Sequence, residues 1–197
     1  MTTPRLLTIM GSGETTATMV AVHRRVFEQF PGRPRVAVLD TPYGFQENAD
    51  ELTERTLAYF RTSLPMAEVV VASLRSLQAP PAAREQALQT LRSADVIFSG
   101  PGSPSYALRV WQAMPVAGIL RAKLGGGALT MASAASITLG RHALPVYEVY
   151  KVGADPHWLD GLDVLTAAGI TAAVVPHWDN AEGGTHDTSR CWLGKRR

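Results

Sequence analysis

Residues 129–140 (LTMASAASITLG) place two serines where an apolar strand is expected to run into a helix. Small residues often gather at such a crossing because strand and helix approach each other closely there, and this structural interpretation needs no chemistry. A serine nucleophile requires the same kind of crossing, because a tight strand-to-helix turn lifts one side chain above the sheet. Ser133 follows the strand directly and is the candidate nucleophile. Ser136, one turn further on, is expected to point into the helix packing.

The neighbours of Ser133 fit a nucleophile turn only in part. Ala132 and Ala134 are small enough for a sharp, crowded turn. A nucleophile elbow usually has glycine two residues before and two residues after the serine. Met131 and Ala135 stand at those positions. Spacing alone therefore leaves both a catalytic and a structural role open for Ser133.

His177 is the candidate general base. It follows the apolar run 172–175 and Pro176, so it is expected at the end of a strand, where a base for a neighbouring serine would lie. A histidine that only caps a strand end is the competing interpretation. His23 lies in an expected helix, directly before Arg24 and Arg25, and this setting predicts a solvated surface side chain.

Glu148 lies in the stretch 145–153 (PVYEVYKVG), in which apolar and polar residues alternate. The alternation favours a half-exposed glutamate on a strand. The functional alternative is a carboxylate that orients His177 and stabilises its imidazolium form. Asp155 and Asp179 are the competing acids, and Asp179 lies two residues after His177.

The stretch 99–105 (SGPGSPS) is either a flexible turn or a source of backbone N–H groups for an oxyanion. Pro101 has no N–H, so Gly102 is the better donor, with the amide of Ala134 as its partner. The stretch 11–16 (GSGETT) lacks the spacing and the lysine of a phosphate-binding P-loop. The histidines and the lone cysteine show no ligand spacing, so we expect neither a metal nor a cofactor.

These residues need elements to position them, and short apolar runs alternate with longer amphipathic ones. Such alternation predicts a three-layer α/β/α sandwich with a mostly parallel central sheet. Ligands bind beyond the carboxyl ends of the strands in such sheets, where the stretches discussed above lie. We expect strands at 5–10, 36–39, 68–71, 95–98, 128–131 and 172–175, and helices at 16–30, 48–64, 82–94 and 104–114.

Composition limits the class of protein. The 197 residues are 46% hydrophobic and 18% charged, which is typical of one soluble globular domain spanning 1–197. The net charge of +2 is too balanced for a nucleic-acid surface. Cys191 is the single cysteine and fits a reducing compartment. Signal-peptide and membrane-spanning runs are not evident, so we expect a cytoplasmic protein without a membrane partner.

Taken together, these segments resemble the serine peptidase family of aspartyl dipeptidase (dipeptidase E) and cyanophycinase. The family's Gly-x-Ser-Ala-Gly-Ala motif corresponds to residues 131–136 (MASAAS), and its glycine-rich turn corresponds to residues 99–102 (SGPG). Its Asn-Pro-His segment corresponds to residues 175–177 (VPH), and a Gly-Glu-Thr-Arg-like stretch to residues 185–190 (THDTSR). The resemblance covers nearly the whole chain and implies the flavodoxin-like fold of class I glutamine amidotransferases.

The resemblance also implies roles. It makes Ser133 the nucleophile, His177 the base and Glu148 the orienting acid, and the order serine, acid, histidine agrees with the family. Gly102 and Ala134 become the oxyanion amides. Substrate binding falls to Thr15, Tyr43 and Arg190, in a pocket that favours acidic residues in the family, because a guanidinium binds both carboxylate oxygens. The sequence stops at 194–197 (GKRR), where the family continues through another strand and helix, which leaves two interpretations: a fragment of a longer chain, or a protein that has lost this pair.

The sequence therefore predicts a serine-type peptidase that hydrolyses a small peptide or amide bond through a Ser-His-Glu triad. The expected partner is a small, acidic peptide, and a homodimer is the assembly considered. A non-catalytic ligand-binding or interaction module on the same scaffold is the alternative, since fold alone does not fix function. Amide transfer is a weaker option, because it needs a cysteine nucleophile and Cys191 does not follow the fifth strand.

Overall fold

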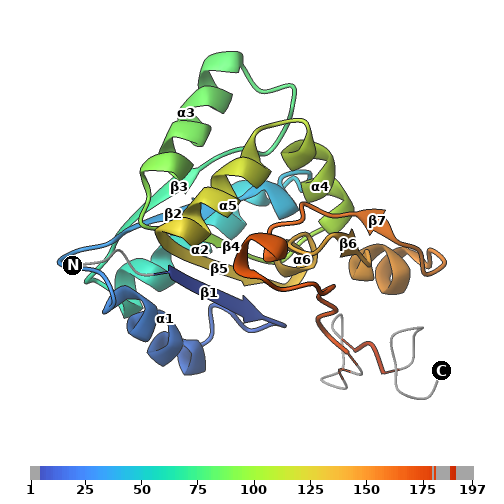
Figure 1. The fold of residues 1–197 in the computed structure, drawn as a ribbon, viewed down its shortest axis with the longest axis horizontal. Coiled ribbons are helices and arrows are strands. Elements are labelled where there is room, and N and C mark those ends of the chain that lie inside the picture. Colours follow the sequence, from blue (N-terminus) through green and yellow to red (C-terminus); the bar gives the residue numbers. More distant parts are fainter. Residues whose placement is uncertain (1–4, 179, 181–186, 190–197) are drawn as a thin grey trace.

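Five parallel strands form the central sheet, in the order β1-β5-β4-β2-β3 (Figure 1). The structure is a computed structural model and describes residues 5–178, 180 and 187–189. The strands of this sheet are β1 (Arg5–Met10), β2 (Arg35–Leu39), β3 (Glu68–Ala72), β4 (Val96–Ser99) and β5 (Gly127–Ala132). Met10 pairs with Ala132, and Ser99 pairs with Met131. The carboxyl ends of these three neighbouring strands therefore meet at one edge of the sheet.

Helices and short hairpin strands make up the remaining elements. The sequence predicted α1, α2, α3 and α4 to within a few residues, whereas the helix α5 was not anticipated. The elements are η1 (Ala17–Met19), α1 (Val20–Phe27), η2 (Thr41–Tyr43), α2 (Ala49–Ser63), α3 (Pro81–Ser93), α4 (Pro104–Gln112), α5 (Val116–Gly125), α6 (Ser133–Ile137), β6 (His142–Ala143), η3 (Glu148–Val152), β7 (Leu159–Asp160) and η4 (Leu165–Ala168).

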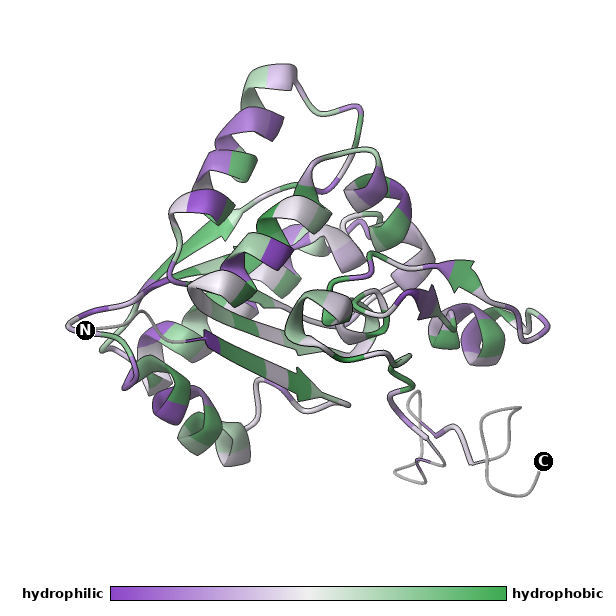
Figure 2. Ribbon diagram, in the orientation of Figure 1, coloured by the Kyte–Doolittle hydropathy of each residue, from purple (hydrophilic) through white to green (hydrophobic). Residues whose placement is uncertain are grey.

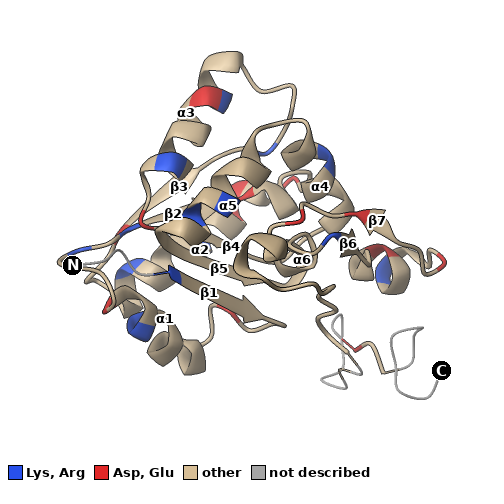
Figure 3. Ribbon diagram, viewed as in Figure 1, with Lys and Arg blue, Asp and Glu red and all other residues tan. Residues whose placement is uncertain are grey.

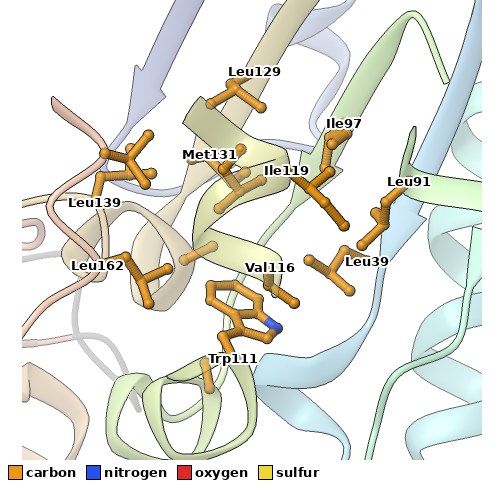
Figure 4. Packing of buried hydrophobic residues seen from close by; sticks show 14 of the residues in the cluster. Leu39, Leu91, Ile97, Trp111, Val116, Ile119, Leu129, Met131, Leu139 and Leu162 are labelled. Atoms are coloured by element: carbon orange, nitrogen blue, oxygen red, sulfur yellow. The ribbon is translucent and has the colours of Figure 1, made fainter. Parts of the chain in front are cut away.

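Alternation along the strands divides the core into two layers, one on each face of the sheet. Val36 and Val38 of β2 pack with Phe27 of α1 and Phe60 of α2. The intervening Ala37 and Leu39 face the other way, toward residues of α3, α4 and α5. Trp111 lies in this second layer, surrounded by aliphatic side chains (Figure 4). The α/β/α sandwich predicted from the sequence is confirmed, because both faces of a parallel sheet must be covered.

The surface carries the polar complement of this core. In Figure 2 the strands are largely hydrophobic, while α3 shows hydrophilic residues along its length. Figure 3 shows acidic and basic residues interspersed over the ribbon rather than gathered by sign. None of the helices in the described part of the chain has the length and apolarity needed to cross a membrane.

Residues 172–175 do not form the sixth strand that the sequence predicted. The carbonyl oxygen of Ala172 lies so close to Gly140 that a Cβ there would approach it to 2.7 Å. Val174 and Val175 are half-buried against the core layer of α3–α6, while Ala172 and Ala173 are exposed. The segment thus crosses the backbone at Gly140 and buries its two valines without joining a ladder.

Two further predictions from local pattern were wrong. His23 is 1% exposed, because it lies on the face of α1 that packs against the sheet, while Arg24 and Arg25 lie outside the core. The stretch around Glu148 forms the π-helix η3 instead of a strand. In this π-helical turn Val149 is buried, while Lys151 and Val152 are exposed. The alternation of apolar and polar residues therefore does not indicate a strand here.

Candidate active site

Ser133 lies at the turn between β5 and α6, at the carboxyl edge of the sheet. Its backbone has φ +48°, in the left-handed region that side chains other than glycine rarely adopt. Such a conformation costs on the order of 1–3 kcal/mol and often occurs at active sites. Ala132 is extended and fully buried, so the chain turns sharply at Ser133. The nucleophile-type turn therefore forms although glycine is missing from the flanking positions.

His177 reaches Ser133 from a segment 44 residues further along the chain. Its Nε2 lies 2.9 Å from Ser133 Oγ, within hydrogen-bond distance. His177 also has a positive φ of +56°. Thr188, which is fully buried, donates its hydroxyl hydrogen bond to the carbonyl oxygen of His177 and thereby holds this strained backbone. The structure thus brings together the serine and the histidine that the sequence singled out.

Ser136 is not placed beside His177 as Ser133 is. It is fully buried, and its hydroxyl donates to the carbonyl oxygen of Ser133 at 2.6 Å. This bond closes the first turn of α6 and supports the conformation of Ser133. Ser136 is a structural part of the turn.

The two predicted oxyanion amides line the same cavity as Ser133 and His177. This cavity has a volume of about 150 Å³, and Gly102 and Ala134 are among its lining residues. Ala134 is the second residue of α6, where a helical N–H has no acceptor within the helix. The aromatic side chains of Tyr147 and Tyr150 also belong to residues that line this cavity.

Gly102 is fixed by the loop that follows β2. It has φ +139°, and a Cβ there would lie 2.1 Å from the carbonyl oxygen of Pro42. The next residue, Ser103, donates its N–H to that same carbonyl at 2.8 Å. Glycine is thus required at this position both for backbone conformation and for space.

Asp40 anchors the loop that carries Pro42. Its carboxylate is fully buried and accepts from Arg75 Nε at 2.6 Å and from the amide of Leu74 at 3.1 Å. Burial raises the pKa of Asp40 above its ordinary value, while Arg75 acts in the opposite direction. This network ties the end of β2 to the end of β3 and so supports the wall of the site.

Within the described part of the chain, the carboxylate of Glu148 is hydrogen-bonded to Ser103 and not to His177. Its Oε1 accepts from Ser103 Oγ at 2.5 Å, and its buried Oε2 has no hydrogen-bond partner there. Of the competing acids, Asp155 is exposed, and Asp179 lies outside the described residues. The role of Glu148 in orienting His177 therefore stays a prediction.

Two of the predicted substrate-binding residues, Thr15 and Tyr43, line the same hollow. Its volume is about 350 Å³, and Gly102 and Arg55 also line it. Tyr43 is only 5% exposed and its hydroxyl lies 3.1 Å from Thr53 Oγ1, so it contributes mainly a wall. Arg190 lies outside the described residues.

Sequence reasoning missed two residues near the site. Ser103 links Glu148 to the loop that carries Gly102, and its position directly before Pro104 is a helix N-cap signal that would have identified it. Glu14, 8% exposed, lines a second hollow of about 590 Å³ together with Ser133 and His177. No signal in the sequence distinguishes Glu14 from an ordinary loop acid.

Comparison with known proteins supports the fold. A peptidase from an acI-B1 Actinobacterium superposes with a TM-score of 0.69 at 17% identity, covering 88% of this chain and 68% of that one. A candidate Peptidase E protein from Listeria monocytogenes EGD-e superposes with a TM-score of 0.61 at 16% identity, covering 89% and 80%. No family model and no curated protein matches the sequence. The chain thus has a peptidase-E-like α/β fold.

Proposed function

We propose that this protein is a serine-type hydrolase that cleaves a peptide or amide bond in a small substrate. The observation that carries the proposal is the 2.9 Å approach of Ser133 Oγ to His177 Nε2 at the wall of an open cavity. A hydroxyl that is hydrogen-bonded to an imidazole nitrogen can transfer its proton during attack on a carbonyl. The names of the two solved structures, a peptidase and a candidate Peptidase E, agree with this chemistry.

The proposed reaction follows from the order of these groups. His177 Nε2, unprotonated, accepts the hydroxyl proton while Ser133 Oγ attacks the carbonyl carbon. The imidazolium then gives that proton to the leaving amine, and water later releases the acyl group by the same route in reverse. The amides of Gly102 and Ala134 donate to the oxyanion of the tetrahedral intermediate.

The substrate class is the second part of the proposal. The hollows that meet at Ser133 and His177 have volumes of about 150 and 590 Å³, which suits a short peptide better than a folded protein chain. Lys151 lines the smaller one and offers positive charge to an acidic peptide, whereas Arg55, which lines the neighbouring hollow of Thr15, is ion-paired with Glu51. We place this activity in the cytoplasm, as the single cysteine suggests.

Hydrolysis of a panel of short peptides tests the proposal. The panel pairs acidic with neutral residues at each end, and release of free amine is measured for the wild-type protein and for Ser133→Ala. We expect at least one peptide to be cleaved by the wild type, with turnover lost in Ser133→Ala. Peptide binding that persists equally in both proteins, without cleavage of any peptide, would instead support a non-catalytic binding module.

A further inference from the structure

The loop that follows β1 forms one wall of the larger hollow beside the catalytic pair. We call residues 11–16 (GSGETT) the glycine-rich loop. A Cβ at Gly11 would lie 4.0 Å from the backbone nitrogen of His177, and one at Gly100 would lie 3.4 Å from Glu14 Oε1. The glycine-rich loop thus packs against the segment that carries His177 and against Gly100, at the start of the loop that carries Gly102. Its shape defines the space next to Ser133.

His23 supports this loop from the core of the protein. Its Nε2 lies 2.7 Å from the carbonyl oxygen of Glu14. A carbonyl oxygen only accepts, so the hydrogen bond requires the tautomer with a proton on Nε2. His23 is 1% exposed, and an apolar side chain would fill this position without any need for a hydrogen bond. The hydrogen bond to Glu14 is therefore the feature that distinguishes the buried imidazole from an apolar side chain at this position.

Four aromatic rings fix the orientation of the imidazole. We call them the aromatic cluster, and they come from α1, α2 and β4. Their centroids lie 5.1 to 6.3 Å from that of His23, and the set comprises Phe27, Tyr59, Phe60 and Phe98. Burial lowers the pKa of His23, more than its hydrogen bond to Glu14 raises it, so the neutral imidazole is favoured. A ring held on this many sides directs Nε2–H at one point of the loop.

A second hydrogen bond reaches the same loop from α2. Tyr59 donates its hydroxyl to the carbonyl oxygen of Thr16 at 3.2 Å. Within the loop, the amide of Thr16 donates to the carbonyl oxygen of Gly13 at 2.9 Å. The loop thus forms a turn whose backbone is held at two residues, Glu14 and Thr16, by side chains from α1 and α2.

We propose that His23 is a positioning residue, which holds the glycine-rich loop in the shape that forms the substrate hollow beside Ser133. The inference rests on the proposed function, because the hollow matters for a substrate only if Ser133 and His177 act on one. His23 itself touches no reacting atom and acts through the backbone of Glu14.

Three variants separate this role from a general contribution to stability. His23→Phe keeps a planar ring in the aromatic cluster and removes the donor to Glu14. His23→Gln keeps an amide donor at a similar distance from the backbone and serves as the conservative rescue. Leu64→Ala is the control, because Leu64 is a fully buried member of the same core layer whose truncation costs about 2–5 kcal/mol without touching the loop.

Two measurements are made on each protein: KM and kcat for a cleaved peptide, and hydrogen exchange of the Thr16 amide. For His23→Phe we expect KM to rise about tenfold with kcat little changed, and exchange to be about tenfold faster, as loss of one buried hydrogen bond implies. His23→Gln should restore most of both values, and Leu64→Ala should change neither.

Wild-type KM and exchange in His23→Phe would overturn the proposal, as would an equal rise of KM in Leu64→Ala. If the wild-type protein cleaves no peptide, the proposed function fails, and KM can no longer be measured as a test of His23. The exchange of the Thr16 amide then still decides whether His23 holds the loop, so the two failures are distinguished.

Discussion

Glu148 Oε1 accepts a hydrogen bond from Ser103 Oγ at 2.5 Å, and this contact connects η3 to the loop that carries Gly102. Ser103 Oγ also accepts from the amide of Tyr106 at 3.0 Å and so caps α4. We expect a carboxylate that orders the residue next to Gly102, the proposed oxyanion donor, to influence catalysis without contacting the histidine. The structure thus offers a route from Glu148 to the reaction that differs from the one expected for a triad acid.

We predict that Ser103→Ala and Glu148→Ala each lower kcat about tenfold, and that the double variant loses little more. Residues that act through one shared hydrogen bond give non-additive effects, which a double-mutant cycle on kcat measures. Ser103→Ala also removes a helix cap, so we expect a loss of about 1 kcal/mol in unfolding free energy.

Additive losses would contradict this coupling. If Glu148 instead orients His177, Glu148→Gln will lower kcat far more than it raises KM, and Ser103→Ala will keep wild-type turnover. Should Asp179→Asn lose turnover while Glu148→Gln keeps it, the assignment of Glu148 as the triad acid is wrong.

Gly102→Ala should abolish activity and destabilise the fold. A Cβ there would overlap the carbonyl oxygen of Pro42, and the φ of +139° is closed to alanine. Gly118→Ala is the matched control, since Gly118 lies in α5 with no atom within 4 Å of the added Cβ. Thermal unfolding should show that the unfolding free energy of Gly118→Ala exceeds that of the wild-type protein by up to about 1 kcal/mol, because alanine favours a helix more than glycine does. Because alanine keeps the backbone N–H, wild-type turnover in Gly102→Ala would contradict the requirement for glycine at this position.

Ser133→Gly should be inactive yet more stable than Ser133→Ala. Glycine adopts the φ of +48° without the steric cost that alanine meets there. We expect a difference of about 1 kcal/mol in unfolding free energy, measured by urea denaturation. Equal stability of the two variants would show that the turn at Ser133 stores no strain in solution.

His23 should make the protein less stable in mild acid. Burial lowers its pKa in the folded state below the ordinary value of 6.5, so above pH 6.5 the imidazole is neutral in both states and its contribution is complete. As the pH falls below 6.5, the unfolded chain takes up a proton that the folded protein does not, and stability falls. The groups packed against His23 are the backbone of Glu14 and the aromatic cluster, in which Tyr59 is the titratable member.

The measurement for this prediction is the unfolding free energy of the wild type and of His23→Phe between pH 7.5 and pH 5, an interval chosen around the ordinary pKa of histidine, about 6.5. The wild type should lose stability more steeply than the variant over that interval. Identical slopes would mean that His23 is protonated equally in both states.

Much of the fold was predictable because buried parallel strands are marked by short apolar runs. Residues 5–10 were predicted with the bounds that β1 has, and the turn at Ser133 followed from the small residues after β5. Residues 172–175 show why such a run is insufficient: whether it pairs depends on a neighbour, and its path over Gly140 is a tertiary contact. Helix α5 was not predicted from the sequence, because its glycines weaken the helical pattern.

The candidate site was predictable to a similar degree. Ser133 and His177 were identified by residue type and by their position after apolar runs, and the structure places them in contact. The partner of Glu148 was not predictable, because η3 turns its side chain toward Ser103 through a π-helix that periodicity does not indicate. His23 was misplaced because its charged neighbours in sequence do not share its face of α1.

The most direct measurement of the central claim is covalent labelling by a fluorophosphonate probe, with the modified residue located by mass spectrometry. Such a probe reacts with a serine that an adjacent base activates, and it needs no knowledge of the substrate. We predict labelling of the wild type at Ser133, unchanged labelling in a Ser136→Ala variant that remains folded, and a strong loss in His177→Gln. Failure of the folded wild-type protein to label, or modification of another serine, would contradict the assignment of Ser133 and His177 as a catalytic pair.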